Sequence, residues 1–267
     1  MEIQLWREVL APYRLAVDEL EIKFNHIIYE SGLRGQYSPI ERVEGRVKKI
    51  SSILDKMQKK NINMNDLEEK VEDIAGVRVI CQFVEDIYRV VEIIEERNDM
   101  KILKRKDYIK VPKNTGYRSY HLIIEYEVNT LKGVKVLPVE IQIRTLAMNF
   151  WATVEHSLHY KYRHHIPEHV LDKLINASNA IVVLDKEMSS VRDEIMDAQN
   201  SFRVKANLVS DILHNLQNLY KAGNRREVQK IQEEFYRVYE MDDIEQLMRF
   251  SQRLDSLAEG HGVQSLH

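Results

Sequence analysis

The sequence V-E-I-Q-I-R-T at residues 139–145 alternates between apolar and polar side chains. Its apolar residues would point to one face of a strand, and Glu140, Gln142 and Arg144 to the other, because strand side chains alternate with a period of two. Upstream lies the loop 113–121, K-N-T-G-Y-R-S-Y-H, where cations and aromatic rings surround a glycine. An ordinary half-buried strand also alternates. An acid, an amide and a guanidinium on one face, following such a loop, nevertheless indicate a nucleotide site.

Composition limits the class of protein. The chain has 267 residues, of which 44% are hydrophobic, enough for one sizeable domain with a packed core plus appended helices. The 39 basic and 42 acidic residues leave a net charge of -3, which argues against a dedicated nucleic-acid binder. Basic residues nevertheless cluster, with seven between residues 42 and 60 and seven between 101 and 121. These clusters indicate a focused site for phosphates, although solvated faces would explain parts of both.

Cysteine content and apolar runs bear on the compartment. The single cysteine, Cys81, excludes an intrachain disulfide and a cysteine-based zinc site, and its apolar neighbours predict a buried, inert thiol. The N-terminus shows no apolar run typical of a secretory signal, and no run approaches membrane-spanning length. We therefore expect a soluble, cytoplasmic protein.

The pattern of apolar residues predicts an α+β fold, in which a mixed β-sheet is flanked by helices and followed by a helical C-terminal part. Helices are expected at residues 3–30, 40–60, 66–71 and 86–97, and strands at 77–83, 101–109, 119–128 and 134–144. From Leu146 onward the sequence favours helices, with amphipathic stretches near 206–221, 224–240 and 242–257. We expect a first domain at residues 1–203 and a helical extension at 204–267.

The helix after Pro167 carries an apolar seam with alternating spacings of three and four residues. The seam consists of Leu174, Ala177, Ile181, Leu184, Met188, Val191, Ile195 and Ala198. Such a seam packs against another helix, either within the chain or across a subunit interface.

Two carboxylates are candidates for a metal site. Asp73 precedes the strand expected at 77–83, and Glu140 lies within a later strand. If the two strands are neighbours, both carboxylates could bind one Mg²⁺ together with phosphate oxygens, since Mg²⁺ takes a few hard oxygen ligands and retains waters. A lone aspartate at a strand entrance is usually a turn or cap residue. Glu140 could also be a structural carboxylate paired with Arg144.

The loop 113–121 has the chemistry of a nucleotide contact. Gly116 gives the backbone freedom, and Tyr117 offers a ring on which a base could stack. Lys113, Arg118 and His121 could contact phosphates. A hairpin loop with surface tyrosines is the alternative. The loop lacks G-x-x-x-x-G-K-[ST], so it is not a P-loop.

The helix that follows the Glu140 strand offers two more candidates, Asn149 and Glu155. Trp151, four residues before Glu155 and on the same side, is expected in the core. The histidines at 156, 159, 164 and 165 are not expected to bind metal, because no motif such as H-E-x-x-H accompanies them.

Four ordered motifs resemble the synthetase domain of the RelA/SpoT-type alarmone enzymes. They are G-R-V-K at 45–48, E-D-I-A-G-V-R at 72–78, G-Y-R-S-Y-H at 116–121 and V-E-I-Q-I-R-T-L-A-M-N-F-W-A-T-V-E-H at 139–156. In length and layout the chain resembles the single-domain small alarmone synthetases, over about residues 1–200. The resemblance implies a nucleotidyltransferase-like synthetase domain that transfers the β,γ-pyrophosphate of ATP to the 3′-hydroxyl of GTP or GDP. The products would be AMP and (p)ppGpp, the alarmone of the stringent response.

The resemblance also implies roles for individual residues. Arg46 and Arg78 would sandwich the adenine. The ATP phosphates would be held by Lys48, Lys56 and Lys59. Asp73 and Glu140 would bind Mg²⁺ and serve catalysis, with Glu140 accepting the proton of the 3′-hydroxyl. The guanine nucleotide would be bound by Lys106, Lys113, Tyr117, His121, Gln142, Arg144, Asn149 and Glu155, with Tyr117 stacking on the base.

The resemblance further implies a homo-oligomer, by analogy a tetramer, and a synthetase without hydrolase activity, because the motifs begin near residue 45. Some members of the group bind alarmone in a cleft lined by an aromatic residue and a threonine just before G-R-V-K. This sequence has Arg42 and Glu44 there and departs from that pattern.

Two other classes of protein stay open. The first is a nucleotide-binding regulatory protein that has lost catalysis, against which the presence of both Asp73 and Glu140 argues. The second is an RNA-binding module, which the net charge of -3 disfavours. Single-stranded RNA could still regulate an enzyme.

Overall fold

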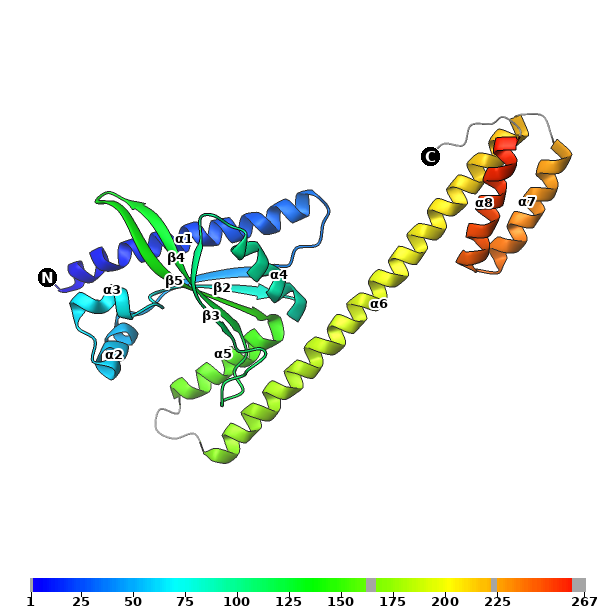
Figure 1. Cartoon of the computed structure of the whole chain (residues 1–267). Coiled ribbons are helices and arrows are strands. Elements are labelled where there is room, and N and C mark those ends of the chain that lie inside the picture. The colour runs from blue at the N-terminus through cyan, green and yellow to red at the C-terminus, as the bar shows by residue number, and fades with distance from the viewer. Residues whose placement is uncertain (1, 162–166, 222–224, 261–267) are drawn as a thin grey trace. The chain divides into compact units, whose positions relative to one another are not determined.

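A mixed five-stranded sheet organises the N-terminal unit, Met1–Ser189, of the computed structural model (Figure 1). Its strands are β1 (Arg42–Val47), β2 (Ala75–Cys81), β3 (Lys101–Asp107), β4 (Tyr120–Thr130) and β5 (Gly133–Thr145). The strand order is β1-β2-β5-β4-β3. β2 and β5 are parallel, and the other neighbours are antiparallel. The predicted α+β class with a mixed sheet is confirmed.

The structure describes residues 2–161, 167–221 and 225–260. The helices are α1 (Glu2–Leu33), α2 (Ile50–Lys60), η1 (Met64–Asp66), α3 (Leu67–Lys70), α4 (Val84–Glu95), α5 (Leu146–Lys161), α6 (Glu168–Lys221), α7 (Arg225–Glu240) and α8 (Ile244–Gly260). His164 and His165 lie outside the described residues, as does the side chain of His159. None of the helices in the described ranges has both the length and the apolar character of a membrane span.

The apolar face of the sheet forms the main core. Val139, Ile141 and Ile143 are fully buried, as the alternation in β5 predicts. They belong to one cluster with buried side chains of α1 and α4, including Leu20 and Ile87. The opposite face of β5 is thereby left to its polar residues.

The helix predicted over 40–60 is wrong in its first part, because Arg42–Val47 form β1 and pair with β2. Gly45 shows why. A Cβ atom at this position would lie 2.3 Å from Val17 Cγ1 of α1, so only glycine lets the strand approach the helix. The Gly45 amide also donates to Glu21 Oε1 of α1 at 2.6 Å. These contacts are between distant segments, which a local helical pattern cannot reveal.

The other element boundaries in this unit shift by a few residues. β2 begins at Ala75 rather than at residue 77 and ends at Cys81, because Phe83 is already the N-cap of α4. The buried carboxylate of Asp86 accepts a hydrogen bond from the Phe83 amide at 3.3 Å, which starts α4 two residues earlier than predicted. The strands expected near 101–109, 119–128 and 134–144 are confirmed as β3, β4 and β5.

The C-terminal unit, Ser190–His267, has a core of its own. The end of α6, α7 and α8 contribute its buried apolar side chains, which are Ile212, Leu216, Leu219, Val228, Phe235, Leu247, Phe250 and Leu254. The stretch predicted at 206–221 is the end of α6 rather than a separate helix, whereas those at 224–240 and 242–257 correspond to α7 and α8. Residues 222–224, where the stretch predicted at 206–221 ends and that at 224–240 begins, lie outside the described residues. Both the division at 189/190 and the predicted boundary at 203/204 fall within α6.

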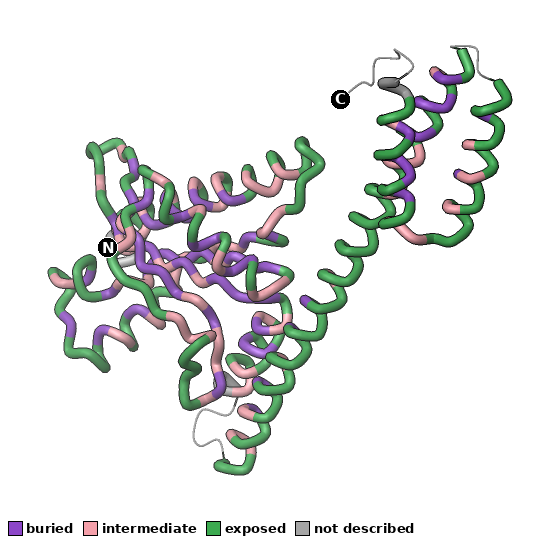
Figure 2. The backbone as a smooth tube through the Cα atoms, turned by 45° about the vertical axis from the view of Figure 1, so that its right-hand side comes forward, coloured by how far each residue is buried: buried purple, intermediate pink, exposed green. Residues whose placement is uncertain are grey.

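The apolar seam of α6 is not buried as one stripe. Leu174 is buried and Ile181 is half-buried against the core. Four later members, Leu184, Met188, Val191 and Ile195, are 47–52% exposed. Figure 2 shows this exposed middle part of α6. A partner helix for the later seam is therefore not found among the described residues.

Candidate nucleotide-binding site

Polar side chains form a row that crosses all five strands of the sheet. In the strand register, Glu44 pairs with Arg78, Arg78 with Gln142, Gln142 with His121, and His121 with Lys106. The residues of this row come from segments up to about a hundred residues apart in the sequence. The strand order brings them to one line on the face opposite the core.

Glu140 lies beside this row, at the register position of Gly76 on β2. Its Oε1 lies 3.0 Å from His121 Nδ1, and its Oε2 accepts a hydrogen bond from Gln142 Nε2 at 2.8 Å. Burial alone would raise the pKa of the Glu140 carboxyl, but the bonds to His121 and Gln142 hold that pKa below its usual value. Glu140 is therefore ionised at neutral pH. Arg144 donates to Gln142, so the alternative Glu140–Arg144 pair is not the one formed.

Asp73 lies just before β2, between two lysines. Lys48 Nζ and Lys56 Nζ each donate to one of its carboxylate oxygens, both at 2.7 Å. Burial would raise the pKa of the Asp73 carboxyl, but the two lysines hold it below its usual value. β2 and β5 are parallel neighbours, so the predicted condition for an approach of Asp73 to Glu140 is met. The charge of Asp73 acts to raise the pKa of Glu140, as expected for nearby carboxylates.

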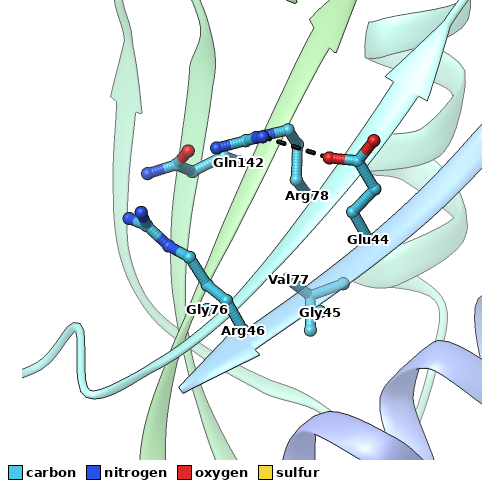
Figure 3. A pocket seen from close by; sticks show the side chains of 7 residues that line it. All are labelled: Glu44, Gly45, Arg46, Gly76, Val77, Arg78 and Gln142. Carbon is cyan, nitrogen blue, oxygen red and sulfur yellow. Dashed lines mark hydrogen bonds and ion pairs between the residues drawn. The ribbon is translucent and has the colours of Figure 1, made fainter. Parts of the chain in front are cut away.

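Two arginines flank a small pocket of about 80 Å³ on β1 and β2 (Figure 3). Its lining consists of Glu44, Gly45, Arg46, Gly76, Val77, Arg78 and Gln142. Figure 3 shows the guanidinium groups of Arg46 and Arg78 and the amide of Gln142 on the same side of the sheet. Gly76 leaves the space beside Arg46 open, since a Cβ there would lie 3.6 Å from the Arg46 side chain. Arg78 Nη1 donates to Glu44 Oε2 at 3.1 Å.

A larger pocket of about 300 Å³ shares three of these residues. It is lined by Arg46, Arg78, Tyr117, Gln142, Arg144, Ala152, Thr153, Glu155 and His156. The structure thus brings the two predicted adenine-side arginines together with four predicted guanine-side residues. Both sets therefore line one pocket.

Tyr117 is held from several sides. Its hydroxyl lies 2.9 Å from His121 Nε2, and its ring packs at 6.5 Å from the ring of Trp151. Lys113 Nζ lies 4.8 Å from the ring centroid, on a loop whose aromatic Tyr108 meets the same cation at 4.7 Å. Burial raises the pKa of Tyr117. This tyrosine is therefore not a surface residue of a plain hairpin loop.

Arg144 and Asn149 carry buried polar atoms without a hydrogen-bond partner in the part of the chain that the structure describes. These atoms are Arg144 Nε and Asn149 Oδ1. Arg144 is only 3% exposed, and burial lowers the pKa of its guanidinium to about 10. Buried polar groups are normally paired, so the unpaired Arg144 Nε, whose residue lines the larger pocket, indicates a position that a ligand completes. Trp151, in contrast, is buried in the core as predicted and donates to the Leu174 carbonyl at 2.9 Å.

Three predicted cations, Lys59, Lys106 and Arg118, line neither of the two pockets. Lys59 is exposed near the end of α2, one turn beyond Lys56, and Lys106 is exposed on β3. The prediction that Arg118 contacts phosphate is not supported. Its Nη1 donates to the Ile109 carbonyl at 3.0 Å and its Nη2 to Asn179 Oδ1 of α6 at 3.3 Å, so it anchors the loop.

Several pocket residues were not predicted. Glu44 was noted only as a departure from a family pattern, and Thr153 and His156 were not assigned to the site. Thr153 and His156 lie three residues apart on α5, beside the predicted Glu155, and this helical spacing was the available signal. No group of three or more metal-binding side chains occurs within the described ranges.

The fold is α+β, with a mixed sheet whose polar face carries Glu140, Arg78 and Arg144 near the Tyr117 ring. Residues 45–165 match the family model described as the region found in RelA / SpoT proteins. The chain is 49% identical over 207 residues to the GTP pyrophosphokinase YjbM of Bacillus subtilis, covering 77% of this chain and 97% of that protein. It is 42% identical over 192 residues to YwaC of the same organism, covering 71% and 91%. The chain therefore belongs to the RelA/SpoT family, in its group of small alarmone synthetases.

The fold agrees with this membership. The crystal structure of small alarmone synthetase 1 from Bacillus subtilis, bound to its product pppGpp, superposes with a TM-score of 0.69 at 49% identity. The match covers 72% of this chain and 98% of that one. About a quarter of the present chain lies outside each of these alignments.

Proposed function

We propose that the protein is a GTP diphosphokinase, which transfers the β,γ-pyrophosphate of ATP to the 3′-hydroxyl of GTP or GDP and yields (p)ppGpp and AMP. Two observations carry this proposal: the charge of Asp73 acts on the Glu140 carboxyl, and one pocket joins Arg46 and Arg78 to Tyr117. The relatives named above are GTP pyrophosphokinases, which supports the same reaction.

The donor ATP is assigned to the β1–β2 side. Arg46 and Arg78 present planar guanidinium groups that can stack on both faces of adenine. Lys48 and Lys56, now paired with Asp73, can turn to the phosphates, and Lys59 lies one turn further along α2. A triphosphate would offer these lysines more negative charge than one carboxylate does.

Asp73 and Glu140 are the residues that would hold Mg²⁺. Two carboxylates and substrate phosphates are the ligands that Mg²⁺ commonly takes in phosphoryl-transfer sites. The donor set of this site fits that requirement, since both carboxylates are ionised and lie near each other. Bound Mg²⁺ would neutralise the charge that develops on the phosphoryl oxygens.

The acceptor nucleotide is assigned to the loop and α5 side. Tyr117 would stack on guanine, while Lys106, Lys113 and His121 would contact phosphates. Arg144 and Asn149, with their unpaired buried atoms, would gain partners from the ligand together with Gln142 and Glu155.

Glu140 is the proposed proton acceptor. The 3′-oxygen forms a bond to the β-phosphorus of ATP as the bond from that phosphorus to the α,β-bridging oxygen breaks, and AMP leaves with the electron pair. The proton of the 3′-hydroxyl passes to Glu140, which is ionised and held by His121 and Gln142.

The test is incubation of the purified protein with Mg²⁺, ATP labelled in its γ-phosphate and either GTP or GDP. We expect the label in a guanosine product, with one AMP formed for each product molecule, and no turnover when EDTA is present. Binding of both nucleotides without turnover would instead support the regulatory alternative. Retention of single-stranded RNA without nucleotide turnover would support the RNA-binding alternative, and adding RNA to an active enzyme tests regulation.

The quaternary structure and domain boundary are part of the proposal. We infer a cytoplasmic homotetramer in which the exposed seam from Leu184 to Ile195 contacts another subunit. The synthetase domain would comprise residues 1–203, with 204–267 as a helical extension. Sedimentation of the intact protein at micromolar concentration tests the assembly, and a monomer would contradict it.

A further inference from the structure

The buried face of α6 in the N-terminal unit carries polar residues beside the apolar Leu174 and Ile181. Ser178, Asp185 and Ser189 are 4%, 5% and 7% exposed. Burying polar groups is unfavourable unless they are hydrogen-bonded. Each of the three is bonded to a different element, so specific hydrogen bonds organise this face together with the first part of the predicted apolar seam.

The three partners differ in their relation to the site. Ser189 Oγ donates to Glu85 Oε2 of α4 at 3.0 Å, and Asp185 accepts from Thr145 Oγ1 at 2.8 Å. Ser178 Oγ donates to the backbone carbonyl of Gly116, in the loop that carries Tyr117. Only the Ser178 bond reaches the proposed guanine-binding loop directly.

Gly116 is packed tightly on α6. Its φ is +87°, a conformation that favours glycine. A Cβ added there would lie 3.0 Å from Ser178 Cβ and 3.3 Å from Ile175 Cα. The loop thus rests on the helix without space for a side chain, and the Ser178 hydroxyl lies where the Gly116 carbonyl needs a donor.

The Gly116 carbonyl belongs to the same planar peptide group as the Tyr117 amide. The hydrogen bond from Ser178 to this carbonyl therefore fixes the orientation of the peptide plane next to the Tyr117 Cα. The loop is anchored a second time when Arg118 donates to Asn179, the residue after Ser178. Tyr117 lies between these two anchors and lines the larger pocket.

We propose that Ser178 is a positioning residue for the acceptor nucleotide, which holds the Gly116–Tyr117 peptide so that the Tyr117 ring is ready to stack on guanine. The inference rests on the proposed function for the identity of the ligand. A group that is ordered before binding avoids the entropy loss of ordering it on binding, so its loss should weaken guanine-nucleotide binding.

Ser178→Ala in the full chain is the test, and Ser189→Ala is its matched control. Both changes remove one hydroxyl from the same buried face of α6, but only the first removes a bond to the loop. We expect Ser178→Ala to raise the KM for GTP by about 3- to 10-fold, the scale of one hydrogen bond. The KM for ATP should change by less than about twofold, the usual additivity error, and Ser189→Ala should leave both values near wild type.

Three results would overturn the proposal: equal rises in both KM values, an unchanged GTP KM in a folded Ser178→Ala protein, or the same GTP effect in Ser189→Ala. If Ser178→Ala does not fold, Ser178→Cys serves instead, because its thiol fills the same site but is a weaker donor to the Gly116 carbonyl. A smaller rise confined to GTP supports the positioning role, and an unchanged GTP KM contradicts it.

Direct binding separates this proposal from the proposed function. Calorimetric titration of GDP without ATP needs no turnover. If the wild-type protein binds GDP but makes no alarmone, the reaction is wrong, while the ratio of GDP affinities between wild type and Ser178→Ala still tests the positioning role. If the wild-type protein binds neither GDP nor GTP in such a titration, both proposals fail.

Discussion

The two sides of the site are held in different ways. On the donor side, the Asp73 carboxylate joins Lys48 to Lys56 by ion pairs in which all three side chains keep some exposure to solvent. On the acceptor side, Arg144 is almost fully buried and Tyr117 is enclosed by rings and cations. The donor side thus consists of ion pairs whose partners can change. The acceptor side is a packed surface of aromatic rings and hydrogen-bonded groups.

This difference suggests two modes of recognition. The ammonium groups of Lys48 and Lys56 can leave Asp73 and bind phosphates with little rearrangement of the fold, because lysine side chains are long and flexible. A base that stacks on Tyr117 meets a ring whose position is already determined by packing. Substitutions on the acceptor side should therefore affect mainly the KM for the guanine nucleotide. Substitutions of residues that lie between the two sides should affect mainly kcat.

The largest effect is expected at Glu140, which lies between the two sides. Glu140→Gln should keep the fold and much of the affinity for both nucleotides, since glutamine retains the shape and can still bond to His121 and Gln142. It should lower kcat by at least about 10²-fold, the usual scale for losing a positioned acid or base. Steady-state kinetics with each substrate varied in turn, together with a thermal melt, measures both.

Near-normal turnover in a well-folded Glu140→Gln protein would end the mechanistic proposal. A lower melting temperature with kcat preserved would make Glu140 a structural carboxylate. Gln142→Glu is unsuitable as a control because it adds a charge beside Glu140. Glu125→Gln on β4 is better, because Glu125 is partly exposed and pairs only with Lys101 in the described part of the chain.

A smaller and more selective effect is expected at Tyr117. Tyr117→Ala removes one stacking platform, worth about 1–3 kcal/mol, so the KM for the guanine nucleotide should rise far more than the KM for ATP. Arg78→Ala is the reciprocal variant and should raise mainly the KM for ATP. Equal effects of Tyr117→Ala on both substrates would remove the distinction between the two sides.

The sequence predicted what depends on short-range pattern. Alternation in β5 placed Glu140, Gln142 and Arg144 on one face, and the parallel pairing of β2 with β5 met the stated condition for Asp73. The pattern could not predict that His121 bonds to Glu140, because that contact needs the order of β4 and β5.

The missed features have the same cause. β1 was read as a helix because its strand character comes from pairing with β2 and from the close approach of α1 to Gly45. On α6, the apolar spacing suggested the buried face, whereas the buried positions include Ser178, Asp185 and Ser189. Their hydrogen-bond partners lie far away in sequence, so a local pattern assigns such residues to the surface.

A still smaller effect is expected on the free energy of unfolding, where substitutions of Asp185 and Asp73 should have opposite signs. Asp185 is bonded to Thr145, whose Oγ1 also accepts a hydrogen bond from the Met148 amide at the start of α5. Burial raises the pKa of Asp185 to about 6. Its ionised form is therefore disfavoured in the folded state, and this penalty is present above about pH 6 and disappears as the pH falls toward the unfolded pKa.

Asp185→Asn should accordingly stabilise the protein by about 1–3 kcal/mol at pH 7.5, with a gain that shrinks between pH 6 and pH 4. Thermal melts across this range measure it. Asp73→Asn, measured without Mg²⁺, should have the opposite sign. The lysines lower the pKa of Asp73, so its contribution is present above the unfolded pKa and lost as the pH falls through the folded value. A Tm gain for Asp185→Asn that does not depend on pH would show that charge burial is not the cause.

The smallest effect is expected from the chain beyond the site. All predicted site residues lie between Arg46 and Glu155, within the unit Met1–Ser189, whose core has no member beyond Ile181. The C-terminal unit has a separate core.

Deleting residues 206–267 should therefore leave Ser178 and Asp185 in place. It should keep kcat and both KM values within a few-fold of the intact protein, as for distant and independent sites. A control cut after residue 173 would remove Ser178 and Asp185 and should abolish activity. Complete loss of turnover in a folded 1–205 chain would mean that the C-terminal unit takes part in building the site, and the separation of donor and acceptor sides from the rest of the molecule would be wrong.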